Sequence, residues 1–173
     1  MFPLTINLTF ITLQGMGNIY VISDLHLGHT NMALHRGFDS VEQHDNHIID
    51  AWNSIVDKGD TVWILGDITM EKRTNYHLLS RLKGYKKVVM GNHDMPQHAR
   101  SLLEYVNSVC GMFKYSSDII LTHCPIHESE IKRFKLNIHG HVHANTLPDK
   151  RYVNVCCEVV DYTPKLINSI IEK

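Results

Sequence analysis

Short apolar runs that stop abruptly at polar side chains recur along this chain. The run at residues 88–90 leads through a glycine into Asn92, His93 and Asp94. Four other apolar runs end in the same way, in Asp24 and His26, in Asp67, in His123, and in His141 and His143. Runs of this length between turn residues are typical of buried strands. Because side chains that follow strands can meet at one edge of a sheet, five such endings predict a single site there.

Apolar residues at helical spacing separate these strands in the first half of the chain. A helix is predicted at residues 40–56, where Ser40 and Gln43 are spaced as a capping box. Further helices are expected at residues 71–82 and 97–107, and a short one is expected to open at Thr163 and Pro164. A loop is predicted at residues 26–37, and later strands at residues 113–115, 118–122, 136–138 and 152–160. This order predicts an α/β sandwich with mixed sheets.

The length and composition are those of one globular domain. With 173 residues and 43% hydrophobic content, the chain can bury about two thirds of the surface that its unfolded state exposes. We expect a single domain at residues 16–173, with residues 1–15 as an N-terminal extension or an extra edge strand. That first segment has no basic residue and therefore lacks the charged start of a secretory signal.

Net charge and cysteine content limit which partners and which cellular compartment we expect. A net charge of −1 gives no drive toward non-specific nucleic-acid binding or toward an anionic membrane. No run of about 18 apolar residues is present to span a bilayer. The four cysteines form no C-x-x-C pair, which favours a reducing, cytoplasmic setting. The 13 histidines, against 17 lysines and arginines, favour binding of a transition metal, because imidazole is a common metal ligand.

In chain order, the polar endings form the motifs D-x-H, G-D, G-N-H-D, H and G-H-x-H. This series resembles the calcineurin-like metallophosphoesterase superfamily, from about Met16 to the end of the chain. The segments at residues 28–31 and 154–164 look like the small single-domain bacterial and phage members. The resemblance implies a four-layer αββα fold, in which two mixed β-sheets are flanked by helices.

The same resemblance implies a site for two divalent metal ions. It assigns Asp24, His26 and His143 to the first ion and Asn92, His123 and His141 to the second, with Asp67 bridging both. It also implies that a hydroxide bridging the metals attacks phosphorus, that His93 protonates the leaving oxygen, and that Asp94 orients His93. Mn is the metal that we expect in this ligand set, and Fe, Zn and Ni fit it as well.

Hydrolysis of a phosphate ester needs an activated water, shielding of negative charge and a proton for the leaving oxygen. A pair of metal ions supplies the first two. We therefore expect an enzyme that hydrolyses a phosphodiester, either a small nucleotide or a generic diester. Phosphomonoesterase and nuclease activities are the alternatives within the enzyme class. A catalytically silent binding scaffold and a one-metal sensor are the alternatives outside it, and the retention of every ligand position favours the enzyme.

The block after Asp67 departs from the larger members of the superfamily. Those members continue G-D-x-x-D-R, and their arginine grips phosphate, whereas residues 68–71 here are Ile, Thr, Met and Glu. This difference argues against a protein serine/threonine phosphatase. The chain also has no spare length for a cap domain, so we expect an open site, which favours diesters.

Two pairs of residues are candidates for substrate contacts. His29 and Asn31 follow the first ligand pair closely, and contact with phosphate and a place in a surface loop are both open for them. Lys132 and Arg133 lie between two ligand-bearing strands. They would bind phosphate or a nucleotide there, unless they belong to a solvated basic loop. The partner that we expect is thus a phosphoester, with a nucleotide as one form of it; the sequence does not indicate an oligomeric state.

Other polar residues are expected outside the ligand set. His139 alternates with His141 and His143 but is expected only as their neighbour. His44 and His47 are expected at the polar surface of their helix. Cys124 is expected as a small packed residue, since no arginine completes the C-x5-R loop that a cysteine phosphatase needs.

Overall fold

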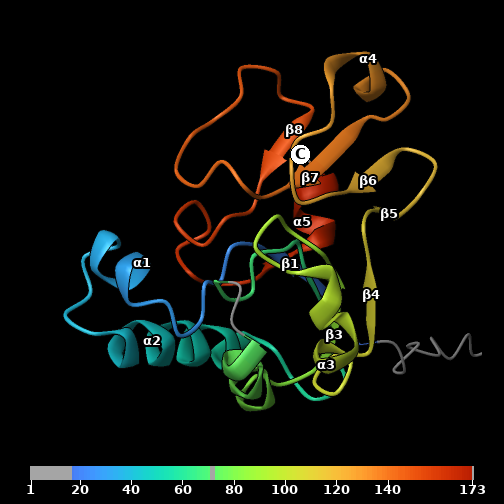
Figure 1. The fold of residues 1–173 in the computed structure, drawn as a ribbon. Coiled ribbons are helices and arrows are strands. Elements are labelled where there is room, and N and C mark those ends of the chain that lie inside the picture. Colours follow the sequence, from blue (N-terminus) through green and yellow to red (C-terminus); the bar gives the residue numbers. More distant parts are fainter. Residues whose placement is uncertain (1–16, 71–72, 173) are drawn as a thin grey trace, which may run out of the picture.

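The computed structural model describes residues 17–70 and 73–172, which form two β-sheets with flanking helices (Figure 1). The expected extension at residues 1–15 lies outside the described residues, as does the expected start of a helix at Glu71. The prediction of two mixed sheets flanked by helices is confirmed. None of the helices in the described residues has the length and apolar character needed to cross a membrane.

The first sheet has the strand order β4-β3-β2-β1-β9. Strands β1 (Ile19–Ile22), β2 (Thr61–Ile64), β3 (Tyr85–Val89) and β4 (Ser108–Cys110) are parallel, and β9 (Lys165–Leu166) is antiparallel to β1. The register aligns the carboxyl ends of the three central strands, because Ile22 pairs with Ile64 and Ile64 with Val88. Whatever follows these strands is therefore brought to one edge.

The second sheet has the order β5-β6-β7-β8. Strands β6 (Ile119–Leu121), β7 (Leu136–His139) and β8 (Tyr152–Asn154) are parallel, and β5 (Phe113–Lys114) is antiparallel to β6. A single bridge between Ser23, just after β1, and Cys156, just after β8, joins the two sheets. The ligand-bearing ends of both sheets therefore meet where this bridge lies.

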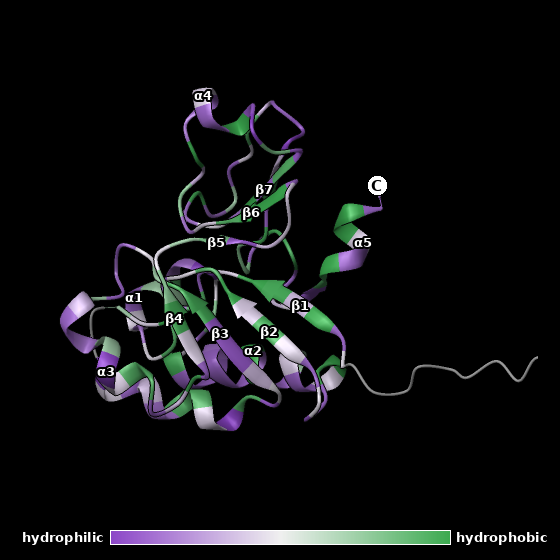
Figure 2. Cartoon of the chain, turned by 90° about the vertical axis from the view of Figure 1, so that its right-hand side faces the viewer, coloured by the Kyte–Doolittle hydropathy of each residue, from purple (hydrophilic) through white to green (hydrophobic). Residues whose placement is uncertain are grey.

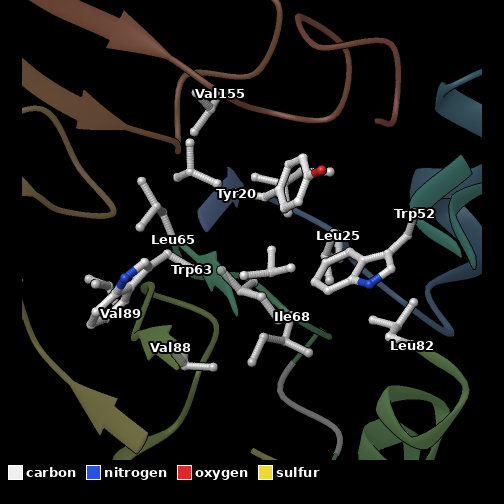
Figure 3. Close-up of a cluster of buried hydrophobic side chains, with 14 of the residues drawn as sticks. Tyr20, Leu25, Trp52, Trp63, Leu65, Ile68, Leu82, Val88, Val89 and Val155 are labelled. Atoms are coloured by element: carbon white, nitrogen blue, oxygen red, sulfur yellow. The ribbon is translucent and has the colours of Figure 1, made fainter. Parts of the chain in front are cut away.

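The longest helix, α2 (Val41–Ile55), lies across the first sheet from the second sheet (Figures 1 and 2). Ser40 Oγ accepts the amide of Gln43, and Gln43 Oε1 accepts the amide of Asp39, so the predicted capping box forms with its return bond shifted by one residue. Trp52 of α2 is fully buried, and its indole N–H donates to Lys83 O at 3.0 Å. Figure 3 shows Trp52 in one core with Trp63, Leu65 and Val155.

The remaining helices are short. They are α1 (Thr30–His35), the 3-10 helices η1 (Arg73–Arg81) and η2 (Pro96–His98), and α3 (Ala99–Leu102), α4 (Glu128–Ile131) and α5 (Ile167–Ile171). The loop expected at residues 26–37 therefore contains α1, which is a correction. The helix expected at residues 97–107 is also wrong in its second half: it ends at Leu102, and Ser108–Cys110 becomes β4, because the open edge of β3 offers it hydrogen bonds.

Two predictions near the C-terminus are wrong for a related reason. The strand expected at residues 152–160 stops at Asn154, whose side-chain oxygen accepts the amide of Cys156 and turns the chain. Cys156 and Cys157, which such a strand would place on opposite faces, are both fully buried. The closing helix begins at Ile167 instead of at Pro164, because β9 first pairs with the free edge of β1. In each case a long-range contact overrides a local pattern.

Candidate metal centre

The predicted ligands come together because five strand ends converge. Backbone bonds join the first two ligand loops: Asp24 N donates to Gly66 O and His26 N to Asp67 O, both at 3.0 Å. In the second sheet, Leu121 pairs with Ile138, so the segments that follow β6 and β7 also lie side by side. Gly140 N then donates to His123 O at 2.8 Å.

The backbone at the site is strained. Asp24, His26, Asp67, His141 and His143 have φ angles of 60°, 50°, 52°, 70° and 50°. Non-glycine residues in this left-handed region each cost about 1–3 kcal/mol, and such residues cluster at functional sites. Five of the seven predicted metal ligands therefore hold a conformation that local preferences disfavour.

Glycines precede two of the ligands for a steric reason. Gly66 has a φ of 88°, and a Cβ there would lie 2.6 Å from His123 Nδ1 and from the backbone of Gly91. A Cβ on Gly91 would overlap with Asp67 Oδ1. The G-D and G-N motifs thus let two loops and a histidine ring approach closely.

The first ligand cluster consists of Asp24, His26 and His143, whose ligand atoms lie within 4.8 Å of one another. The Nε2 atoms of His26 and His143 are each 3.9 Å from Asp24 Oδ1. Asp24 Oδ1 and both ring nitrogens of His26 are buried and have no hydrogen-bond partner. Buried polar atoms without partners are rare and call for an explanation such as an ion. The cluster therefore fits a divalent cation.

The protonation of His26 suits this interpretation. Burial lowers the pKa of His26 to about 3, despite the opposing charge of Asp67. The ring is therefore neutral at physiological pH, which is the form that binds a metal. Its ring also stacks on that of His143, with the centroids 5.4 Å apart.

The second oxygen of Asp24 is held by the protein. Asp24 Oδ2 accepts the amide of His141 at 2.9 Å and the thiol of Cys156 at 3.1 Å, and it lies 2.5 Å from Ser23 Oγ. These contacts fix the carboxylate so that Oδ1 faces the histidines. Outer contacts of this kind orient metal ligands.

The second cluster is built around His123. Its Nε2 is 2.9 Å from Asn92 Oδ1 and 3.4 Å from Asp67 Oδ2, and its ring centroid is 5.0 Å from that of His141. Two cis ligands at about 2.1 Å from an octahedral ion are about 3 Å apart, so the first distance fits a shared cation. His123 Nδ1 donates to Leu65 O at 2.8 Å, which directs Nε2 toward the site.

Asp67 lies between the two clusters. Its Oδ2 is 3.4 Å from His123 Nε2 and 4.0 Å from His26 Nε2, while Oδ1 accepts the amide of His93 at 2.9 Å. Burial would raise the pKa of Asp67, but the hydrogen bond and charge of His123 lower it. For His123, burial would lower the pKa, and Asp67 raises it. The carboxylate is thus ionised where a bridging ligand is predicted.

Relatives of the chain are small proteins of archaea and phages. It is 33% identical over 175 residues to the uncharacterized protein MJ1445 of Methanocaldococcus jannaschii, covering 92% of this chain and 94% of that protein. It is also 33% identical to the Gene 66 protein of Mycobacterium phage L5, covering 75% and 79% of the two chains. The chain belongs to this family. No protein-family model matches it.

Solved structures share the fold. AQ665 from Aquifex aeolicus, a protein of unknown function, is 26% identical, with a TM-score of 0.69 over 90% of this chain and 98% of its own. A novel archaeal phosphodiesterase is 18% identical, with a TM-score of 0.50 over 80% and 82% of the two chains. The predicted resemblance is confirmed at the level of the fold.

Behind the predicted ligands lie two charged residues that the sequence did not single out. Glu158 Oε1 is 2.9 Å from His143 Nδ1, and it accepts Arg36 Nη2 at 2.8 Å. Arg36 also donates to the backbone oxygens of Asp24 and Leu25, at 2.7 and 3.2 Å. Arg36 and Glu158 are 122 residues apart. Glu158 lies within the segment at residues 154–164, but no pattern in the sequence pairs it with Arg36.

This pair fixes the charge around the first cluster. Burial would raise the pKa of Glu158, but the hydrogen bond to His143 and the charge of Arg36 lower it to about 2. A permanent carboxylate on Nδ1 directs Nε2 of His143 toward Asp24 Oδ1. Arg36 Nη1 also lies 2.9 Å from His44 Nε2. His44 is fully buried, so its expected place at the polar surface is wrong, whereas His47 is exposed.

Asp94 connects the ligand loops through their backbones. Its carboxylate accepts the amides of Asp67 at 2.8 Å, Ile68 at 3.1 Å and Gly91 at 2.9 Å. Burial raises the pKa of Asp94 against these hydrogen bonds. The ring centroid of His93 lies 5.9 Å from that of His26, at the edge of the first cluster. The acid role of His93 and the orienting role of Asp94 remain predictions.

The predicted substrate contacts lie in two different places. His29 and Asn31 line a hollow of about 190 Å³ with Met70, and the His29 ring centroid is 6.1 Å from that of His26. Lys132 and Arg133 follow α4 at the outer end of the second sheet (Figures 1 and 2). Arg133 Nη1 is 3.4 Å from Glu130 Oε2, and both side chains are exposed. Substrate binding by all four predicted contacts remains a prediction.

His139 and Cys124 were both expected outside the ligand set, and the structure places them differently. His139 is buried beside the ligand segment, with Nδ1 donating to Gly140 O at 2.9 Å, and it is assigned no metal. Cys124 is exposed, so its expected packing is wrong. One ligand atom from each of Cys124, His123 and His141 lies within 4.8 Å of the other two.

Proposed function

We propose that this protein is a metal-dependent phosphoesterase that holds two divalent cations and hydrolyses phosphodiesters. The observation that carries the proposal is the placement of Asp67 Oδ2 between His26 and His123, beside buried atoms without partners in Asp24 and His26. Six ligands divide around this carboxylate into two groups, as a two-metal centre requires. The archaeal phosphodiesterase of the same fold adds support.

The residues would share the work as follows. Asp24, His26 and His143 would hold the first ion, Asn92, His123 and His141 the second, and Asp67 both. The two ions, Mn or else Fe, Zn or Ni, would shield the phosphate charge and lower the pKa of a bound water so that it attacks at neutral pH. The buried, neutral imidazole of His26 and the ionised Asp67 are already in the states that such ligands need.

His93 would supply the proton for the leaving oxygen. Its amide is fixed by Asp67 Oδ1 at 2.9 Å, so its half-buried ring stands beside the bridging carboxylate. An imidazolium at this position can protonate the ester oxygen as its bond to phosphorus breaks, and the ring then recovers a proton from water. Asp94 would hold this segment in place through the amide of Gly91.

Hollows on both sides of the centre favour a diester. A groove of about 270 Å³ beside the second cluster is lined by Asn92, His123 and the apolar side chains of Met90, Met112 and Ile126. The hollow at His29 and Asn31 flanks the first cluster. A diester has an organic group on each side of its phosphorus, and the two hollows provide one place for each. A monoester would use only one of them.

A substrate panel on metal-loaded protein tests this function. We expect faster hydrolysis of bis-p-nitrophenyl phosphate than of p-nitrophenyl phosphate, and two metal ions per chain by elemental analysis. Faster turnover of the monoester would favour the phosphomonoesterase, and cleavage of single-stranded oligonucleotides in preference to cyclic nucleotides would favour the nuclease. No turnover with any divalent metal would support the binding scaffold, and one ion per chain would support the sensor.

All four cysteines are unpaired, which agrees with the proposed cytoplasmic location.

A further inference from the structure

Cys124 faces the second ligand cluster. It directly follows His123, and its sulfur lies within 4.8 Å of a ring nitrogen of both His123 and His141. It also lines the same groove as Asn92 and His123. A sulfur and two imidazole nitrogens, all of which can bind transition metals, therefore lie close together at this cluster.

The position of Cys124 is set by a buried polar network. Thr122 Oγ1 donates to Cys124 O at 2.7 Å, and Asn137 Nδ2 donates to Thr122 Oγ1 at 2.9 Å. Asn137 Oδ1 accepts the amide of Ile126 at 2.9 Å, on the other side of Cys124. Thr122 is 5% exposed and Asn137 0%. The backbone that carries the thiol is therefore anchored on both sides.

The other cysteines are placed differently. The thiol of Cys156 is buried and donates to Asp24 Oδ2, so it supports a ligand from behind. Cys157 is buried in the core, and Cys110 Sγ donates to Val88 O at 3.5 Å. Cys124 alone among the four is exposed. It is therefore the most accessible of the four thiols to an incoming ion.

We propose that Cys124 is an additional ligand of the second ion, beside Asn92, His123 and His141, and that it makes this position selective for softer metals. The inference rests on the proposed function, because it needs a second metal position. When the ion binds, a sulfur–metal bond forms and the thiol proton passes to water. Soft thiolate favours Zn over Mn, whereas the first cluster offers only carboxylate and imidazole. A mixed centre follows, with the softer ion in the second position.

Cobalt substitution tests the sulfur ligand directly. We would load wild-type protein, Cys124→Ser and Cys110→Ser with two equivalents of Co²⁺ and record their absorption spectra. Wild type and Cys110→Ser are expected to show a near-ultraviolet sulfur-to-cobalt charge-transfer band, and Cys124→Ser is expected to lack it. All three should keep the visible d–d bands. Equal charge-transfer bands in wild type and Cys124→Ser would overturn the inference.

The d–d bands separate the two proposals. If two cobalt ions bind per chain with d–d bands but without charge transfer in the wild type, Cys124 is not a ligand and the two-metal centre stands. If no cobalt binds at all, the proposed function itself fails. These outcomes do not depend on turnover.

A thiol-reactivity measurement on wild-type protein avoids any effect of substitution on folding. Cys124 should react with a disulfide reagent in metal-free protein at a pH high enough to form its thiolate, and Zn²⁺ should slow this reaction much more than Mn²⁺ does. Mapping of the modified peptide assigns the reacting cysteine. Equal reactivity of Cys124 with and without bound Zn²⁺ would contradict ligation.

Discussion

The two ligand clusters differ in burial and in support. Asp24 and His26 are 0% and 1% exposed, whereas Asn92 and His141 are exposed at the surface. The side chain of His143 in the first cluster is held by the charged pair Arg36–Glu158, while that of His123 in the second is directed by a bond to a backbone oxygen. A buried site whose ligands are already oriented binds an ion with little reorganisation. The comparison therefore indicates a tight first position and a more exchangeable second one.

Asp67→Ala should have the largest effect, because it removes the one carboxylate that both clusters share. Loss of a residue that only hydrogen-bonds to a metal ligand typically lowers activity or metal affinity about 10–100-fold. Loss of a ligand shared by both ions should therefore lower activity more than about 100-fold. Turnover of bis-p-nitrophenyl phosphate and metal content per chain measure it. His77→Ala, at an exposed position outside the ligand clusters, is the matched control. Full activity in Asp67→Ala would remove the basis of the two-metal centre.

His93→Ala should cost about 10²–10⁴-fold in kcat, which is the usual contribution of a general acid. The loss should grow as the leaving group becomes more basic, because a good leaving group needs no proton. A series of aryl diesters with increasingly basic leaving groups would show this, while metal content stays unchanged. A loss that is the same for every leaving group would instead assign His93 to binding.

Glu158→Gln should weaken the first position and spare the second. The substitution keeps the size of the side chain but removes the charge that orients His143, so metal affinity there should fall about 10–100-fold. Competition with a chelator, read separately for the two ions, measures this difference. Equal weakening of both positions would mean that Arg36 and Glu158 support the whole centre rather than one side of it.

The same pair should make the stability of metal-free protein depend on acid. The pKa of Glu158 falls from its ordinary 4.5 to about 2 in the folded state. Its contribution to the free energy of unfolding is therefore present above pH 4.5 and is lost as the pH falls toward 2. Denaturant unfolding across this window should show a shallower pH dependence in Glu158→Gln than in wild type. An identical pH dependence in the two proteins would mean that the pKa of Glu158 is the same in the folded and the unfolded state.

The smallest effect is expected from Lys132→Ala combined with Arg133→Ala. Both residues are exposed, and Arg133 is near Glu130, so each contact with substrate would be screened by water and worth at most about 1 kcal/mol. We expect KM to change less than it does in His29→Ala, whose ring lies beside the first cluster. A larger rise of KM in the double variant would place the substrate over the second sheet.

Much of the site could be predicted because every predicted ligand lies just after a strand. Asp24, Asp67 and Asn92 come directly after apolar runs that pair in parallel, so their convergence follows from strand order. The capping of α2 by Ser40 was also predictable, because Ser40 and its partner Gln43 are only three residues apart. Strands β4 and β9 were not, because each forms only by pairing with an edge that a distant segment leaves open.

The sequence alone therefore predicted the two mixed sheets, which the structure confirms, and a set of candidate ligands, which the structure brings together. Tertiary structure decided which oxygen of Asp24 is hydrogen-bonded by the protein and which faces the histidines. It also placed Arg36 and Glu158, which are 122 residues apart, behind His143. It also turned Cys124 outward beside His141. Local periodicity records which face of a strand is buried, whereas these contacts arise only when segments without a shared pattern pack against one another.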